Sequence, residues 1–398
     1  MHCIVAQDNR FVLNQGRPAS FNTFYERFGQ RYLDVFDSVT ILGRLFPIED
    51  PTARPVEGPG VTFAPMPAYV GPLQYLAKRR AIQARVRSLY SKHAAVIIHP
   101  STTGMALIKE MKRFGHPYAM EVGADPYDVL APGSIRHPLR PILRQILPRN
   151  LQLNCRNACG VLYVTQAALQ QRYPCPQYEI GVSDVELPAQ YLVRQPRKFQ
   201  PDQTQFTLVL VGSLEQLYKG PHILIEAITT CIQQGLNLNV NIIGEGKHRP
   251  ELEQQARKLG INTKIHFLGK LPAGEAILQQ LDQADVFVMP SFQEGLPRAM
   301  VEAMARGLPC IGSSVGGIPE LLSTEDLVPP GSVKALADKI YAVVTSPQRM
   351  NRMSIRNLET AHQYSAEKLR QKRIQFYEFV QQANLEWQHR NNITDVIH

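Results

Sequence analysis

The chain has 398 residues, more than one hydrophobic core usually supports, so we expect two domains. Apolar residues make up 44% and charged residues 19%, which excludes disordered and fibrous classes. No apolar run approaches the ~18–20 residues of a membrane-spanning helix, and residues 1–6 lack the features of a signal peptide. We therefore expect a globular cytoplasmic protein.

Positive charge is concentrated in the first half. Residues 1–200 hold 24 basic against 14 acidic residues (+10), whereas residues 201–398 hold 19 against 20 (−1). The cluster Lys78, Arg79 and Arg80 would attract an anionic partner such as acidic lipid, nucleic acid or a phosphate-bearing substrate. Few aromatic residues lie among the basic ones, so nucleic acid is not expected. A solvated basic face is the alternative interpretation.

The first half contains short apolar runs that predict strands. A proline-rich stretch, Pro47–Pro72, should be an extended connection. The six cysteines include no CxxC pair, so no disulfide framework is predicted, and we expect no metal and no cofactor. The expected strands are Cys3–Ala6, Val39–Leu42, Val61–Ala64, Ala95–Ile98, Tyr118–Val122 and Val161–Val164.

A linker is expected between Val185 and Gln203, where the pattern lapses. We therefore predict domains at residues 1–190 and 191–364. In the second, strands alternate with helical stretches, which predicts β-α-β units and a parallel sheet. Those strands are Phe206–Val211, Val240–Ile243, Ile265–Leu268, Val286–Met289 and Cys310–Gly312.

Residues 365–398 form a third segment, in which an amphipathic helical pattern carries Leu369, Phe376, Phe379 and Val380 on one stripe. We expect this helix to cross back towards the N-terminal domain.

Three of the second-half strands are followed by a glycine-containing turn and a proline that suits a helix start: Pro221, Pro297 and Pro319. In a parallel sheet these helix starts share one edge, where open α/β sheets bind ligands. Backbone N–H groups and helix dipoles at that edge favour an anion.

Two motifs at this edge carry chemistry. Glu294 and Glu302 are separated by seven residues; the first lies in a loop and the second inside a helix, so they are not a side-by-side acid/base pair. The segment Val211–Gly220 places Lys219 before a helix start, where its ammonium would lie beside a phosphate.

Residues 206–322 resemble the group 1 (family 4) retaining glycosyltransferases. The resemblance rests on the Glu-x7-Glu motif, the strand-Gly-Ser…Lys-Gly segment, Ile243-Gly-Glu-Gly, Phe267-Leu-Gly and Gly316-Gly-Ile-Pro-Glu, in this order and spacing. It implies an α/β fold of two facing Rossmann-like domains with parallel sheets, called GT-B.

The resemblance also implies roles for individual residues. Lys219 would neutralise the diphosphate leaving group, Glu294 would contact hydroxyls of the donor sugar, and Glu302 would bind the ribose. The remaining donor-binding positions are Gly16, Gly212, Ser213, Gly269, Lys270, Gly295 and Leu296.

This sequence departs from the family pattern at two places. Ser213 stands where the family often has Arg, which leaves more of the diphosphate charge to Lys219. The loop with Gly16 offers one glycine where two are usual. His99 and Asp125 follow first-half strands and are candidate catalytic residues on the acceptor side; the alternative is a hydrogen-bonded loop residue.

The implied function is metal-independent transfer, with retention, of a sugar from UDP-sugar or GDP-sugar to a glycan or lipid-linked acceptor in polysaccharide or cell-envelope synthesis. The enzyme could lie peripherally on the inner face of the membrane. The alternatives are a nucleotide-sugar epimerase or phosphorylase on the same fold, or a non-catalytic basic-surface binder.

Overall fold

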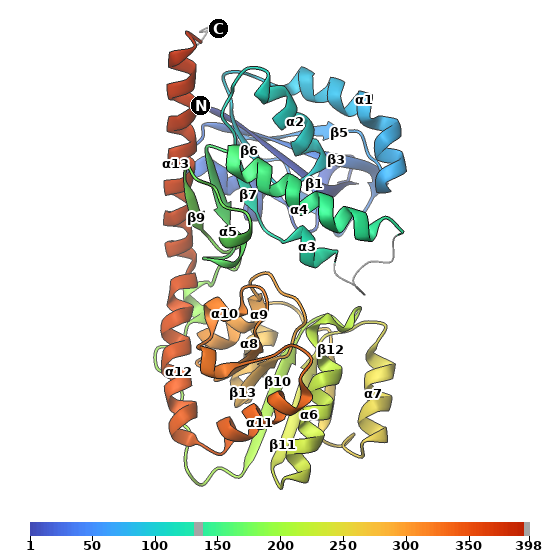
Figure 1. The fold of residues 1–398 in the computed structure, drawn as a ribbon, viewed down its shortest axis with the longest axis vertical. Coiled ribbons are helices and arrows are strands. Elements are labelled where there is room, and N and C mark those ends of the chain that lie inside the picture. The colour runs from blue at the N-terminus through green and yellow to red at the C-terminus, as the bar shows by residue number, and fades with distance from the viewer. Residues whose placement is uncertain (131–137, 394–398) are drawn as a thin grey trace.

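Two separate β-sheets organise the chain in the computed structural model, which describes residues 1–130 and 138–393 (Figure 1). We call the body around the first sheet the N-domain and the body around the second the C-domain. The strands of the N-domain are β1 (His2–Asn14), β2 (Arg17–Ser20), β3 (Ser38–Glu49), β4 (Arg54–Pro55), β5 (Val61–Met66), β6 (Ala95–Ile98), β7 (Ala119–Val122), β8 (Gly160–Tyr163) and β9 (Glu179–Gly181).

The parallel core of the N-domain sheet runs in the order β5-β3-β1-β6-β7-β8-β9, and β2 and β4 add a short antiparallel edge. The chain order reverses between β1 and β6, so the loops after these two strands diverge and leave a crevice. The helices of this domain are α1 (Gly71–Leu89), α2 (Thr102–Lys112), α3 (Pro126–Val129), α4 (Arg140–Asn157) and α5 (Ala168–Arg172).

The C-domain sheet is parallel throughout and runs in the order β12-β11-β10-β13-β14-β15, with its reversal between β10 and β13. Its strands are β10 (Gln205–Val211), β11 (Asn237–Ile243), β12 (Ile265–Gly269), β13 (Val286–Met289), β14 (Cys310–Ser313) and β15 (Leu327–Val328). Its helices are α6 (Pro221–Gln233), α7 (Arg249–Lys258), α8 (Glu275–Gln283), α9 (Arg298–Ala305), α10 (Ile318–Leu321), α11 (Val333–Val344) and α12 (Pro347–Ala361).

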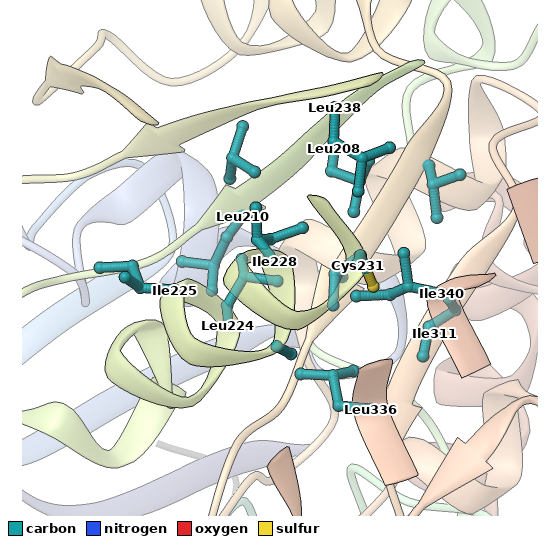
Figure 2. Close-up of a cluster of buried hydrophobic side chains, with 14 of the residues drawn as sticks. Leu208, Leu210, Leu224, Ile225, Ile228, Cys231, Leu238, Ile311, Leu336 and Ile340 are labelled. Carbon is teal, nitrogen blue, oxygen red and sulfur yellow. The ribbon is translucent and has the colours of Figure 1, made fainter. Parts of the chain in front are cut away.

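The C-domain has a buried core on each face of its sheet: α6 and α11 cover one face, and α8 and α9 cover the other. Figure 2 shows Leu224 and Ile228 of α6 beneath Leu208 and Leu210 of β10, and these side chains are fully buried. Burying a leucine or isoleucine contributes about 1.5–3 kcal/mol. This packing fixes the strand ends that carry the functional loops.

The last helix, α13 (Ala366–Arg390), leaves the C-domain and runs along the N-domain (Figure 1). Leu369, Phe376, Tyr377 and Val380 are buried in the same cluster as Val5 of β1. The predicted return of the C-terminal helix is thereby confirmed; residues 394–398 lie outside the described residues.

The chain passes between the domains at two adjacent places. The linker residue Leu187 donates its N–H to the carbonyl oxygen of Tyr364 (3.0 Å), and Ala366 donates to the carbonyl oxygen of Leu187 (3.0 Å). These two crossings therefore form one hydrogen-bonded hinge.

Candidate active site

Lys219 and Glu294 meet at the reversal point of the C-domain sheet. Lys219 ends a 3₁₀ turn after β10, and Glu294 lies in the loop after β13. The Nζ of Lys219 donates to Oε1 and Oε2 of Glu294 at 2.6 and 2.9 Å, and Ser291 Oγ donates to Oε1 at 2.7 Å. Only 13% of the Lys219 side chain and 6% of the Glu294 side chain are exposed. The two predicted residues thus form one shielded ion pair.

Glycine is required where these loops touch backbone to backbone. Gly220 has φ +71°, and a Cβ there would lie 2.1 Å from the carbonyl oxygen of Pro290. Gly316 has φ +53°, and a Cβ there would lie 1.9 Å from the carbonyl oxygen of Glu294. A side chain at either position would push the loops apart. The glycine motifs of the sequence therefore hold the Lys219–Glu294 pair in place.

Glu302 lies on α9, whose N-terminus follows Glu294, Gly295 and Leu296. Burial raises the pKa of Glu302, and Arg298 on the preceding turn opposes this shift. The two carboxylates of the motif therefore have different surroundings: Glu294 faces an ammonium, whereas Glu302 is half-buried and available to accept hydrogen bonds from hydroxyl groups.

The other predicted donor-binding residues border the same strand ends. A Cβ on Gly212 would lie 2.9 Å from Cγ of Lys219, so the lysine stem lies over Gly212. Ser213 Oγ accepts a hydrogen bond from the N–H of Glu215 (3.2 Å), which tightens the turn after β10. Gly269 accepts from the N–H of Gly244 (2.8 Å), and Lys270 is exposed beyond it.

A cavity of about 510 Å³ lies at the strand ends of the N-domain and reaches the C-domain at Arg298; we call it the interdomain cavity. Lys219, Glu294 and Glu302 are not among its lining residues, but a Cβ on Gly295 would lie 3.8 Å from the carbonyl oxygen of Gly123, which lines it. Its walls come from the strand ends of the N-domain, from the linker, and from α9 and α13. The residues used below are Gln7, Asn9, Thr23, Arg27, Phe28, Arg31, His99, Glu121, Asp184, Glu186, Arg298 and Arg373.

His99 lies at the reversal point of the N-domain sheet, after β6, with Phe28 beside its ring (centroids 5.4 Å apart). Its Nε2 lies 3.3 Å from Oε2 of Glu121. A carboxylate only accepts hydrogen bonds, so we assign the ring proton to Nε2, which leaves Nδ1 as an acceptor. Both residues line the cavity; His99 was among the predicted site residues, whereas Glu121 was not.

Glu121 is held by residues that the sequence pattern did not single out. It forms an ion pair with Arg31, and it accepts a hydrogen bond from the Tyr377 hydroxyl of α13 (2.8 Å). Burial acts against its charge, but Arg31, His99 and Tyr377 together hold the pKa of Glu121 below its usual range. Helix α13 therefore holds Glu121 in place through Tyr377, and Arg373 of the same helix lines the cavity itself.

We expect His99 to be uncharged at neutral pH, because burial lowers its pKa from 6.5 to about 4. In the unfolded chain the ring takes up a proton near pH 6.5. The stabilisation from the neutral ring is therefore complete above pH 6.5 and is lost as the pH falls from 6.5 towards 4. NMR titration of the His99 Cε1–H signal, assigned with His99→Gln, should show a midpoint well below 5. A midpoint between 6 and 7 would contradict the assignment.

Asp125 and Gly16 lie outside the residues that line the cavity. Asp125 caps α3 by accepting from the N–H of Tyr127 (2.8 Å), and it also binds Arg172. Gly16 sits with Gln15 at the tip of the β1–β2 hairpin, because β1 continues to Asn14 instead of ending near Ala6. Asp125 therefore caps a helix and Gly16 forms a turn, and neither lines the cavity. Gln7 and Asn9 line it instead, at the place where the Gly16 loop was expected.

Glu320, the last residue of the Gly316 motif, joins the two domains. Its carboxylate accepts from the N–H groups of Gln166, Ala167 and Ala168, at 2.5, 3.0 and 2.7 Å. These groups lie at the start of α5 in the N-domain. The motif thus packs against the Glu294 loop on one side and holds the opposite domain on the other.

The chain is similar in sequence to known proteins. Residues 194–360 match the family model of the glycosyl transferases of group 1. Protein CapJ of Staphylococcus aureus is 26% identical over 350 residues, which cover 87% of each chain. The amylovoran biosynthesis glycosyltransferase AmsK of Erwinia amylovora is 37% identical over 128 residues, 30% of this chain and 31% of that one.

The fold is also found among solved structures. Anabaena HepE in complex with UDP and glucose superposes with a TM-score of 0.62 at 19% identity, over 96% of this chain and 100% of that one. The protein therefore has the GT-B arrangement of two facing α/β domains, as predicted. Residues 194–360, the segment that matches the family model, are similar to the glycosyl transferases of group 1.

Proposed function

We propose that this glycosyltransferase moves a sugar from a nucleotide-sugar donor to a glycan or lipid-linked acceptor in polysaccharide or cell-envelope synthesis, with retention of anomeric configuration. The observation that carries the proposal is the shielded Lys219–Glu294 pair at the reversal point of the C-domain sheet. The adjacent Gly295 lies opposite Gly123 of the interdomain cavity, which His99 also lines. The names of AmsK and of the HepE–UDP–glucose complex support the same class of reaction.

Each group then has a distinct task. Glu302 would accept hydrogen bonds from the ribose, the backbone near Gly269 and Lys270 would border the base, and Lys219 would balance the diphosphate. Glu294 and the amides of Gly295 and Leu296 would hold the sugar. Nδ1 of His99 would accept a hydrogen bond from a sugar hydroxyl on the opposite wall. UDP-sugar is the donor that we favour, with GDP-sugar as the alternative.

Breaking the anomeric C–O bond places negative charge on the leaving diphosphate and positive charge on the sugar ring. Lys219 and the N-terminus of α9 would stabilise the diphosphate at the moment its charge develops. Glu294 already accepts hydrogen bonds from Lys219 and Ser291, so it is suited to orient the sugar and need not form a covalent bond to it. We propose attack by the acceptor from the face that the diphosphate leaves, without a metal ion.

Nucleotide-sugar binding and turnover test the proposal. UDP or a UDP-sugar at 100 times its dissociation constant should stabilise the protein by about 2.7 kcal/mol, seen as a raised Tm. Free UDP should form from the preferred donor only when an acceptor is added, and EDTA should leave the rate unchanged. An epimerised donor without UDP release would indicate the epimerase alternative. Activity lost on chelation and restored by Mg²⁺ or Mn²⁺ would contradict metal independence.

The outer face of α1 supports peripheral binding to an anionic membrane at the cytoplasmic side. Leu73 and Leu76 are 83% and 60% exposed, and the neighbouring Lys78, Arg79 and Arg80 are exposed as well. Apolar and basic side chains on one helix suit a lipid headgroup surface. Among the described residues, no helix is both long and apolar enough to cross a bilayer.

We expect the protein to sediment with vesicles that contain anionic lipid, and the binding to fall with added salt. Each basic residue near such a surface contributes about 1 kcal/mol. Changing Lys78, Arg79 and Arg80 together to Gln should therefore weaken vesicle binding by more than 10-fold. The matched control changes Lys247, Arg257 and Lys258, exposed on the C-domain, to Gln and should bind as the wild type does. Equal binding to neutral and anionic vesicles would refute the proposal.

A further inference from the structure

A buried amide in the interdomain cavity has a donor group without a partner. Gln7 is 2% exposed and lines the cavity. Its Oε1 accepts a hydrogen bond from Asn9 Nδ2 (3.0 Å), and Asn9 also donates to Thr23 Oγ1 (2.6 Å). Within residues 1–130 and 138–393, Gln7 Nε2 has no hydrogen-bond partner. Because an unpaired buried N–H group is unfavourable by about 1–3 kcal/mol, this orientation points to a ligand oxygen.

Two arginines of the same cavity come from opposite domains and carry no ion pair among the described residues. Arg27 lies in a π-helical turn of the N-domain, Tyr25–Gly29, and Arg298 begins α9 of the C-domain. The hydrogen bond recorded for the Arg298 side chain goes to the backbone carbonyl oxygen of Asp184 (3.2 Å). Burial and the nearby Arg298 lower the pKa of Arg27, and the charges of Asp184 and Glu186 oppose this shift.

The other charges of the cavity are largely balanced. Arg31 is paired with Glu121, and Arg373 is paired with Glu186 (2.8 Å). His99 is uncharged near neutral pH. The remaining carboxylate of the cavity lining is Asp184, which is exposed at the linker. Its backbone carbonyl oxygen accepts a hydrogen bond from Arg298, and its charge acts on Arg27. Among the residues that line the cavity, apart from the paired Glu186, these two arginines are opposed by Asp184 alone, which leaves one excess positive charge at this end. Glu302, outside the lining, also acts on Arg298.

We propose that this end of the cavity is the acceptor subsite, and that it takes a glycosyl unit bearing a carboxylate or phosphate that bridges Arg27 and Arg298 while Gln7 Nε2 donates to one of its oxygens. This inference rests on the proposed glycosyl transfer and adds the charge of the acceptor. Guanidinium groups bind such anions through paired, charge-assisted hydrogen bonds. Because the two arginines lie on different domains, an anion between them would contact both domains.

The test compares anionic and neutral sugars of equal size on the full chain with saturating UDP. Dissociation constants of methyl β-glucuronide, glucose 1-phosphate and methyl β-glucoside are measured by saturation-transfer NMR. We expect the wild type to bind at least one anionic probe about 10-fold more tightly than the neutral one, and the preferred probe distinguishes a carboxylate from a phosphate. Arg27→Gln and Arg298→Gln should bring the ratio of anionic to neutral affinity close to one. Gln7→Glu, which keeps an oxygen that accepts the hydrogen bond from Asn9, should lower this ratio too.

Arg17→Gln is the matched control, because Arg17 is exposed on β2 outside the cavity and the variant should keep the wild-type ratio. Equal affinities of the wild type for anionic and neutral probes would overturn the inference, as would an unchanged ratio in both cavity variants. If the variants instead alter the choice between UDP-glucuronate and UDP-glucose, the anion belongs to the donor and the acceptor assignment is wrong. Failure of the wild type to bind UDP would overturn the proposed function itself.

Discussion

Removal of the Lys219 ammonium is expected to lower the rate of sugar transfer by roughly 100- to 1,000-fold, the loss typical of a preorganised group that stabilises developing negative charge. Lys219→Gln keeps a hydrogen-bond donor towards Glu294 but removes the charge next to the diphosphate. Ser213 in the turn after β10 is uncharged, and no other cation lies between it and Lys219 in the sequence, so none from that turn compensates. The measurement is kcat with the preferred donor and acceptor, with thermal unfolding to check the fold.

Glu294→Gln tests the other half of the pair. It should also reduce kcat strongly, and the double variant should lose little more than Lys219→Gln alone, because the two side chains act as a unit. Lys247→Gln, which changes an exposed lysine of the same domain, should behave as the wild type. Turnover near the wild-type rate in either site variant would remove the assignment of this pair as the centre of catalysis.

Replacing Asp326 by asparagine is expected to give the largest loss of stability among the substitutions considered. Asp326 is fully buried and binds two arginines of α12, Arg349 (2.9 Å) and Arg356. Breaking a buried ion pair from one side destabilises by about 3–5 kcal/mol, and here the partner charges of Arg349 and Arg356, 17% and 31% exposed, would stay partly buried. In a domain of this size we expect Tm to fall by about 10 °C.

Calorimetry of Asp326→Asn checks this expectation. Lys334→Gln is the comparison, since Lys334 forms an ion pair with Asp338 (2.6 Å) in which the two side chains are 88% and 54% exposed. Such a surface pair contributes less than about 1 kcal/mol. UDP binding at low temperature should persist in both variants. A Tm for Asp326→Asn within 2 °C of the wild type would show that α12 is held by apolar packing alone.

Buried apolar runs account for most of what the sequence could predict. Val286–Met289 is a strand with the predicted bounds, because a central parallel strand is apolar at every position. Pro221 and Pro297 lie at helix starts as expected. The C-domain side of the site followed from local motifs, since Lys219 and Glu294 each occupy a loop next to a predicted strand.

The N-domain side of the site could not be predicted in this way. Arg31 lies in a short 3₁₀ helix, Gln30–Asp34, and Tyr377 reaches Glu121 from a helix at the other end of the sequence. The loop with Gly16 also lies away from its expected position, because β1 is 13 residues long and does not end near Ala6. Such contacts join residues that are far apart in the sequence, so no local sequence pattern predicts them.

The return of α13 has a consequence for synthesis on the ribosome. The side chains of Phe376 and Tyr377 fill the cluster that contains Val5, so the N-domain lacks part of its interior until the end of the chain has emerged. Domains usually fold in order as the nascent chain leaves the exit tunnel. Here the C-domain can complete its core first. The N-domain keeps part of its apolar interior exposed, and accessible to chaperones, until the final helix packs against it. Stop codons that remove α13 should therefore impair the half of the protein that is translated first.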